Sequence, residues 1–256
     1  MKIFCIIPAR FGSTRAKAKL LRKILNKPLI EWVWRNVSKM SFFEGVFIAT
    51  DSKEIENAAK KFGGKIIKTS SLHKCGTDRV SEAAKILNID KEDIIVNVQA
   101  DEPLISSLAI ENLISYLKKA EEIDMATLAY KSSDAKSFEN SNVVKVVVDK
   151  DNFALYFSRS PVPYYRGGIK ERFTFLKHFG IYSYRMNFLQ KIAKLPVSSL
   201  EEKEKLEQLR ILENGYKIKV IISESDAESV NVEEDFKTVE KLLRTRLKSC
   251  DNCLSA

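Results

Sequence analysis

The sequence lacks the features of exported and membrane-embedded proteins. No apolar run among its 256 residues is long enough to cross a bilayer. The N-terminus enters a strand-like run directly, without the charged, apolar and cleavage regions of an export signal. We therefore expect a protein that acts in the cytoplasm and has no membrane partner.

Cysteine is scarce, and its spacing offers no disulfide or metal framework. Cys5 lies in the first apolar run, where it is expected to be a small core residue. Cys250 and Cys253 form a lone CxxC pair in the polar stretch 249–256. A structural zinc site needs four ligands and neither histidine is nearby, so an unstructured tail is expected there in preference to a metal site.

Several catalytic signatures are also missing. The chain has no GxSxG nucleophile, no Cys–His pair with family spacing and no Walker A lysine pattern. The first loop contains only Gly12, so the GxGxxG pattern of a nicotinamide dehydrogenase is absent. No protein nucleophile is evident.

The net charge of +9 arises mostly from lysines that have acidic residues beside them. This pattern is typical of a solvated surface, and it lacks the basic stripe with interleaved aromatic residues of a nucleic-acid binder. A basic balance also suits an enzyme whose substrates are anions.

A short apolar run at Ile3–Ile7 predicts a strand buried on both faces. Pro8, which has no N–H to donate, is expected to end its hydrogen-bond ladder. The loop that follows is crowded with cations and donors: Arg10, Ser13, Thr14, Arg15, Lys17 and Lys19. A strand that opens into such a loop favours a phosphate site, and the alternative is a solvated basic loop.

The first half of the chain alternates between strands and helices. Strands are expected at 3–7, 45–50, 65–69 and 94–99, and helices at 28–40, 54–62, 77–87 and 107–119, with Thr77 or Asp78 as a helix cap. This order predicts an α/β fold with a mainly parallel sheet and helices on both faces. Its ligand is expected at the carboxyl ends of the strands, where the polar clusters 8–19, 70–79 and 99–103 lie.

The second half has a different texture. Strand-like runs at 125–130, 143–148, 153–157 and 177–184 predict an antiparallel insertion, about 125–185, that forms a lid or a subunit contact. Helices are expected at 186–194 and at 200–214, the latter closed by Gly215, followed by a strand at 218–223 and a helix at 233–247. With no repeat and no long linker, residues 1–248 are predicted to form one domain.

Four positions in these segments are candidates for chemistry. Asp101, after a central strand, is placed to bind Mg²⁺, although it could instead cap a helix. Arg159 could face an anionic substrate or form a surface ion pair. His178 is more typical of a hydrogen-bonded packing residue than of a base, and Glu207-Gln208 is typical of solvated helix surface. A phosphate loop, a metal carboxylate and no nucleophile together indicate direct phosphoryl or nucleotidyl transfer.

Short segments along almost the whole chain resemble one family, the 3-deoxy-manno-octulosonate (Kdo) cytidylyltransferases, or CMP-Kdo synthetases. The matching segments are IIPARFGSTR (6–15), NKPLI (26–30), ATD (49–51), GTDR (76–79), VNVQADEP (96–103), ALYFSRS (154–160), HFGIY (178–182) and LEQLR (206–210). The resemblance implies a Rossmann-like nucleotide-diphospho-sugar transferase fold and a homodimer built through the insertion. It also implies transfer of CMP from CTP to the anomeric hydroxyl of Kdo or 8-amino-Kdo, for lipopolysaccharide synthesis.

The same resemblance implies a role for each matching residue. Arg10, Lys19 and Asp101 would be catalytic, and Asp101 and Asn231 would hold Mg²⁺ as cofactor. The nucleotide would be bound by Pro8, Ala9, Arg10, Ser13, Arg15, Lys19, Gly76, Arg79 and Gln99. The acidic sugar would be bound by Arg159, His178, Tyr182, Glu207 and Gln208.

Three departures from the family pattern bear on activity. The family loop Arg-Leu-Pro-Gly-Lys-Pro-Leu is here the stretch 15–21, RAKAKLL, which keeps the lysine but loses the proline and glycine. Ala100 replaces a glycine, so its methyl group would obstruct close approach of the nucleotide or would force a backbone change if that position needs positive φ. In the family pattern Val-Asp-Thr-Pro-Glu-Asp, the second Mg²⁺ carboxylate becomes Asn231. We expect weaker metal binding, a shifted metal preference, or help from Asp226 or Glu233, and loss of activity is a further alternative.

These departures keep a second hypothesis open, a catalytically weak nucleotide-binding homologue with a scaffold or regulatory role. Within the enzyme hypothesis another acidic sugar, such as a sialic acid, is an alternative that the 206–210 match disfavours.

Overall fold

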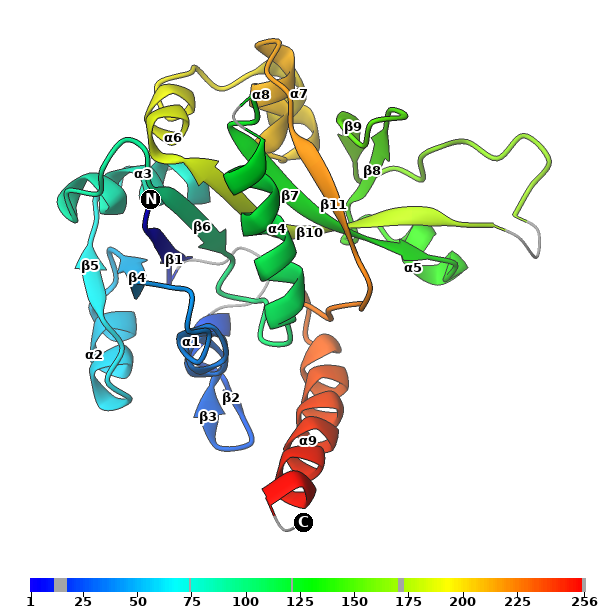
Figure 1. Cartoon of the computed structure of the whole chain (residues 1–256). Coiled ribbons are helices and arrows are strands. Elements are labelled where there is room, and N and C mark those ends of the chain that lie inside the picture. The colour runs from blue at the N-terminus through cyan, green and yellow to red at the C-terminus, as the bar shows by residue number, and fades with distance from the viewer. Residues whose placement is uncertain (12–17, 74, 121, 170–172, 255–256) are drawn as a thin grey trace.

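The strand β1 (Ile3–Ala9) lies near the centre of a nine-stranded sheet. The structure, a computed structural model, describes residues 1–11, 18–73, 75–120, 122–169 and 173–254, with side chains up to residue 248. Seven strands run in the order β11-β7-β10-β6-β1-β4-β5, and β8 and β9 branch from β10. The predicted mainly parallel α/β sheet is confirmed (Figure 1).

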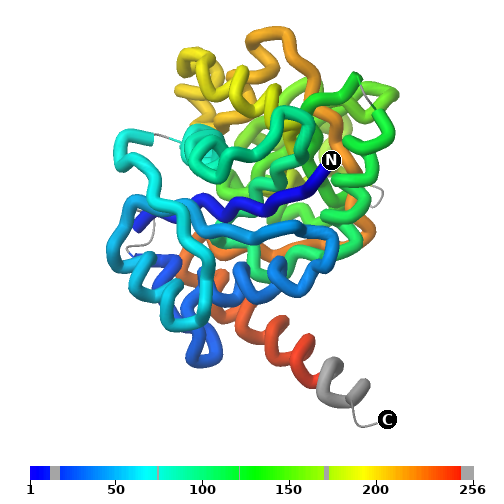
Figure 2. Tube along the Cα trace, turned by 60° about the vertical axis from the view of Figure 1, so that its left-hand side comes forward, coloured from blue at the N-terminus to red at the C-terminus, as the bar shows by residue number. Residues whose placement is uncertain are grey.

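Both faces of β1 are covered because its side chains alternate between two cores. Cys5 and Ile7 pack in one core with α1 (Leu29–Ser38), α2 (Lys53–Lys61), α4 (Ser107–Lys119) and α9 (Asp235–Leu254). Ile6 packs in the other with α3 (Gly76–Ile86), α6 (Met186–Ile192) and α8 (Gln208–Glu213). Figure 2 shows α9 extending away from these layers toward the C-terminus.

The parallel half of the sheet brings the polar clusters to one edge. β1 pairs with β4 (Gly45–Thr50) and with β6 (Ile94–Val98), and β4 pairs with β5 (Ile66–Lys68), all in parallel. Arg10, Asp51, Thr69 and Gln99 therefore follow the carboxyl ends of four neighbouring strands, as the strand order predicts.

An antiparallel strand joins this edge to the rest of the molecule. β10 (Phe175–Arg185) pairs with β6 and with β7 (Met125–Ser132), and β7 pairs with β11 (Lys219–Ser223). The register pairs Ile181 with Val98, so β10 residues before Ile181 extend beyond the carboxyl end of β6.

Within the range 125–185 expected for the insertion, β7 and β10 pair with strands of the central sheet. The part between them forms an arm that contains α5 (Ala135–Glu139), β8 (Lys145–Val148) and β9 (Ala154–Ser158) (Figure 1). Within the arm, fully buried Lys145 donates from Nζ to the carbonyls of Val143 at 2.7 Å and Arg159 at 2.6 Å.

Three local predictions are wrong. Pro8 does not end β1, because its pairing with β4 continues to Ala9; only the ladder to β6 stops earlier, at Ile6. The N-cap of α3 is Cys75, so Thr77 and Asp78 lie inside the first turn. The helix expected at 200–214 is broken by Lys205, at φ 54°, into α7 (Ser199–Glu204) and α8.

The C-terminal segment also differs from the expected unstructured tail. The helix α9 continues to Leu254 and so includes Cys250 and Cys253. Among the described residues, no helix is both long and apolar enough to span a membrane.

The first loop returns to regular structure at a short 3₁₀ turn, η1 (Lys19–Leu21), followed by a small hairpin of β2 (Lys23–Ile24) and β3 (Lys27–Pro28). Ala18 precedes the turn in the left-handed region, at φ 56° and ψ 24°. A Cβ atom makes this conformation unfavourable, whereas glycine adopts it freely. Ala18 occupies the position of the family's loop glycine.

Replacing Ala18 with glycine should stabilise the protein. The relieved strain exceeds the entropy that glycine adds to the unfolded chain, so the free energy of unfolding should rise by about 0.5–1 kcal/mol. Chemical denaturation without ligands measures this change. The matched control is Ala58→Gly inside α2, which should lower the free energy of unfolding by about 1 kcal/mol. Equal losses in both variants would show that Ala18 is unstrained.

Candidate active site

Gly76, the first residue of α3, is the point where the predicted nucleotide residues meet. A Cβ atom added to Gly76 would lie 3.2 Å from Gln99 Nε2, 3.5 Å from Pro8 Cγ and 3.6 Å from Glu207 Oε1. These side chains come from the ends of β1 and β6 and from the turn between α7 and α8. A glycine here lets the three segments approach one another, and a Cβ atom would require a small shift of the Gln99 amide.

A charged pair joins the first loop to the end of β6. Lys19 Nζ donates to Asp101 Oδ2 at 2.7 Å and to the carbonyl of Val230 at 2.8 Å. The backbone N–H of Val230 donates to the carbonyl of Asp101 at 2.9 Å. The segment after β11 is thus fixed beside Asp101. The helix-cap alternative for Asp101 is wrong, because α4 begins at Ser107.

Glu102 is a buried carboxyl group that sequence reasoning did not assign. It is 5% exposed, and among the described residues its Oε2 atom has no hydrogen-bond partner. Burial, reinforced by the charge of Asp101, raises the pKa of Glu102 to about 8. Its place in the acidic 101–103 motif was the signal that could have identified it.

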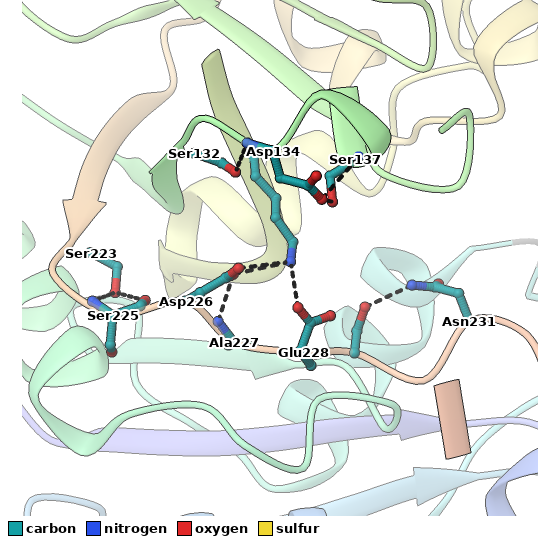
Figure 3. A network of polar contacts seen from close by, with 11 residues as sticks. Ser132, Asp134, Ser137, Ser223, Ser225, Asp226, Ala227, Glu228 and Asn231 are labelled. Carbon is teal, nitrogen blue, oxygen red and sulfur yellow. Dashed lines mark hydrogen bonds and ion pairs between the residues drawn. The ribbon is translucent and has the colours of Figure 1, made fainter. Parts of the chain in front are cut away.

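Asn231, the predicted second metal ligand, is held within its own turn. Its Nδ2 donates to Ser229 Oγ at 2.7 Å, and its backbone N–H donates to Asp235 Oδ2 at 2.6 Å (Figure 3). The residues expected to assist it are paired elsewhere: Asp226 lies 3.0 Å from Lys177 Nζ, and Glu233 pairs with Arg22.

Lys177 is a second cation that the sequence interpretation missed. It is buried, and the carboxylates of Asp226 and Glu228 face its ammonium at 3.0 and 3.4 Å. Figure 3 shows both carboxylates on the segment that leads to Asn231. The nearby acidic groups, Asp226 first, outweigh burial and raise the pKa of Lys177, so it stays charged.

Arg79 is buried and bridges the ends of two strands. Its guanidinium contacts Asp51 Oδ1 at 3.1 Å and donates to Thr69 Oγ1 at 2.5 Å. These contacts hold the loops after β4 and β5 together. The Arg79 guanidinium thus has a structural role here, and its predicted contact with the nucleotide stays a prediction.

Arg159 follows β9 and reaches the end of α7. Its Nε donates to the carbonyl of Glu204 at 2.7 Å, and its Nη1 donates to the carbonyl of Ser141 at 3.0 Å. Two of the acceptors that hold the guanidinium are therefore backbone carbonyls.

The remaining predicted sugar residues are mostly buried. Tyr182 is 4% and Gln208 is 2% exposed, and within the described structure Gln208 Nε2 has no hydrogen-bond partner. Glu207 is half-buried at the break between α7 and α8, and its Oε2 accepts from the N–H of Thr77 at 3.1 Å. The solvated-surface alternative for Glu207-Gln208 is therefore wrong.

His178 is a neutral, packed imidazole. Its ring lies 4.8 Å from that of Phe157, and its Nε2 is 2.9 Å from Thr127 Oγ1. Because the Thr127 hydroxyl donates to the carbonyl of Ile181 at 2.7 Å, His178 Nε2 must be the donor to Thr127. Burial lowers the pKa of His178 to about 3, so the imidazole is neutral near pH 7.

Two further predictions concern residues 13 and 15. Ser13 and Arg15 lie outside the described residues, and their proposed phosphate contacts stay predictions.

Arg10 is exposed at the end of β1, and Ala9 is buried in its last position. Ala100 does not take a positive φ; it is 4% exposed and packs in the core, so the expected backbone conflict does not arise.

Together these groups form a polar edge of an α/β sheet, with the Lys19 ammonium from the first loop opposite the Asp101 carboxylate after β6. Sequence comparison specifies the class: residues 4–218 match the cytidylyltransferase family.

Curated relatives match nearly the whole chain. One, a 3-deoxy-manno-octulosonate cytidylyltransferase of Syntrophobacter fumaroxidans, is 44% identical, with 95% of this chain and 97% of the relative covered. An 8-amino-3,8-dideoxy-manno-octulosonate cytidylyltransferase of Shewanella pealeana is 43% identical, with 95% and 99% covered.

Solved structures agree. A CMP:2-keto-3-deoxy-manno-octonic acid synthetase complexed with CTP has a TM-score of 0.86 at 36% identity, with 96% of this chain and 100% of that chain covered. A 4-diphosphocytidyl-2C-methyl-D-erythritol synthase from Anaerococcus prevotii, 17% identical at a TM-score of 0.60 with 95% and 96% covered, shares the fold. This chain belongs to the 3-deoxy-manno-octulosonate cytidylyltransferase family.

The lowered pKa of His178 predicts a pH-dependent stability. The unfolded chain binds a proton near pH 6.5 and the folded chain only near pH 3, so stability falls as the pH drops through this window. His178 should contribute a slope that approaches about 1.4 kcal/mol per pH unit. Denaturation curves between pH 6.5 and 4.5 measure it. His178→Gln should remove this part of the slope, and His73→Gln, at the other histidine, should retain it. Parallel curves for wild type and His178→Gln would contradict the assignment.

Proposed function

We propose that this chain transfers CMP from CTP to the anomeric hydroxyl of Kdo or 8-amino-Kdo, releasing diphosphate, and so supplies an activated sugar for lipopolysaccharide synthesis. The observation that carries the proposal is the near-complete match to relatives of these two names, each covering 95% of this chain. The structure supports it because Lys19, Asp101, Gly76, Gln99 and Glu207 gather at one sheet edge.

The charges at this edge suit transfer at a phosphate. In the transfer, the sugar oxygen forms a bond to the α-phosphorus, the bond to the β-phosphate oxygen breaks and the hydroxyl proton is released. Lys19 and Arg10 would stabilise the negative charge that develops on the leaving diphosphate. The Lys19–Asp101 pair neutralises both groups before substrates arrive, and a triphosphate would draw Lys19 away from Asp101.

The donor set suits Mg²⁺ with substrate oxygens completing its shell. Among the described residues, no three acidic, histidine or cysteine side chains are arranged to hold a metal by themselves. Mg²⁺ commonly uses one or two protein carboxylates and takes its other ligands from phosphates and water. We propose that Asp101 and the amide oxygen of Asn231 would hold it. A bound Mg²⁺ would neutralise phosphate charge and orient the triphosphate.

We also propose that the chain acts in the cytoplasm as a homodimer joined through the arm. Leu155, at 62%, and Tyr164, at 86%, are exposed large apolar residues in this region, and such residues gather where a partner binds. Molar mass in solution tests the dimer.

The function is tested by diphosphate release from CTP with Kdo and with 8-amino-Kdo, over a Mg²⁺ and Mn²⁺ titration. Turnover with one or both sugars is expected, and the ratio of the two rates identifies the preferred substrate. CTP binding without turnover at any metal concentration would instead favour the scaffold hypothesis, for which Asn231 is the main support.

Asp101→Asn should lower kcat by about 100-fold or more, because it removes the carboxylate that faces the metal and Lys19. The fold should survive, as circular dichroism can verify. Asp90→Asn, an exposed carboxylate on the loop that precedes β6, is the matched control and should retain wild-type rates. Near-normal turnover by Asp101→Asn would mean that the metal is held elsewhere.

Asn231→Asp should restore a second carboxylate and lower the Mg²⁺ concentration needed for half-maximal rate. The measurement is a metal titration at saturating CTP and sugar. Asn57→Asp, which adds the same charge on the exposed face of α2, should leave the metal dependence unchanged. The same midpoint in both variants would show that residue 231 does not face the metal.

A further inference from the structure

Glu204, the last residue of α7, makes an unusual set of contacts with the end of β9. Its carboxylate accepts from Ser158 Oγ at 2.6 Å and from the backbone N–H of Arg159 at 2.9 Å. Its own carbonyl accepts from Arg159 Nε at 2.7 Å. Glu204 therefore holds Arg159 by both backbone and side chain.

These contacts fix the direction of the Arg159 side chain. A carboxylate that accepts from a backbone N–H and a neighbouring hydroxyl sets the position of the Arg159 Cα atom. The contact from Nε to the helix-end carbonyl then sets the path of the side chain, and it also satisfies a carbonyl that has no partner within the helix. From the other side, Lys145 Nζ donates to the Arg159 carbonyl at 2.6 Å.

The same turn reaches the nucleotide side of the site. Lys205, in the left-handed region, reverses the chain directly after Glu204. Three residues after Glu204, Glu207 Oε2 accepts from the N–H of Thr77 at the start of α3. The segment 204–208 thus joins Arg159 on the arm to the loop that contains Gly76.

We propose that Glu204 is a positioning residue for the acidic sugar: it holds Arg159 in place to receive the sugar carboxylate. The inference rests on the proposed function, since the role of Arg159 in the sugar site comes from the family resemblance. Glu204 does not touch the reacting atoms, so its effect is on sugar affinity.

The test combines equilibrium binding with steady-state kinetics. Calorimetric titration of Kdo or 8-amino-Kdo measures the sugar Kd without catalysis, and diphosphate release gives KM for the sugar and for CTP separately. Glu204→Ala should raise the sugar Kd and KM about tenfold, because the Arg159 backbone N–H loses the carboxylate that fixes it and the side chain is then carried out of position. The CTP KM should stay within about twofold of wild type.

Three further variants sharpen the result. Glu204→Gln keeps one acceptor oxygen and should recover part of the affinity. In the Arg159→Ala background, Glu204→Ala should add less than about twofold, because the two residues act as a unit. The matched control is Glu202→Ala, an exposed carboxylate on the same helix, which should leave the sugar KM unchanged.

The outcomes separate the inference from the function on which it rests. If the wild-type chain binds the sugar and the folded Glu204→Ala variant binds it with the same Kd, only the positioning role is overturned. Parallel changes in the sugar KM, the CTP KM and the thermal midpoint would overturn it as well, since they indicate only a structural role. A wild-type chain that binds neither sugar overturns both proposals.

Discussion

The ion pair between Lys19 and Asp101 is the contact around which three distant parts of the chain are ordered. The Lys19 side chain is 11% exposed, and its ammonium lies between the Asp101 carboxylate after β6 and the Val230 carbonyl after β11. Partly buried charges are stable only when they are paired and hydrogen-bonded, so the first loop, the central strand and the C-terminal segment must come together or leave a charge unsatisfied. The same requirement makes the pair sensitive to an incoming polyanion, which offers Lys19 a stronger partner.

The sheet and its polar edge could be predicted because they follow from local patterns. Continuous apolar runs at Ile3–Ile7 and 94–98 require two covered faces, and polar residues directly after them must lie at one edge. The break at Lys205 could not be predicted, because lysine has no preference for the left-handed region and only tertiary contacts place it there. For that reason Glu207-Gln208 was interpreted as helix surface.

Buried charge was the other limit of sequence interpretation. The sequence does not reveal that Lys177 and Glu102 are buried, because their burial depends on β10 extending past the end of β6. The partners of Lys177 depend in addition on the 226–228 segment, which brings Asp226 and Glu228 to it. Arg79 shows the same limit: the family motif identifies this residue, but not its contacts with Asp51 and Thr69, which are set by the spacing of β4 and β5.

The departures at Ala18 and Ala100 differ in their structural effect, since only Ala18 takes a backbone conformation that glycine would favour.

The unbroken path of β10 has a mechanical consequence. Its first residues pair with β8 in the arm and its last residues pair with β6 in the core, with a register shift between Phe179 and Tyr182. A strand held at both ends transmits displacement along its length, so a displacement of the arm would be felt at Gly180, where the Gln99 side chain packs. The position of the arm and the position of the Gln99 side chain are then mechanically coupled through one strand.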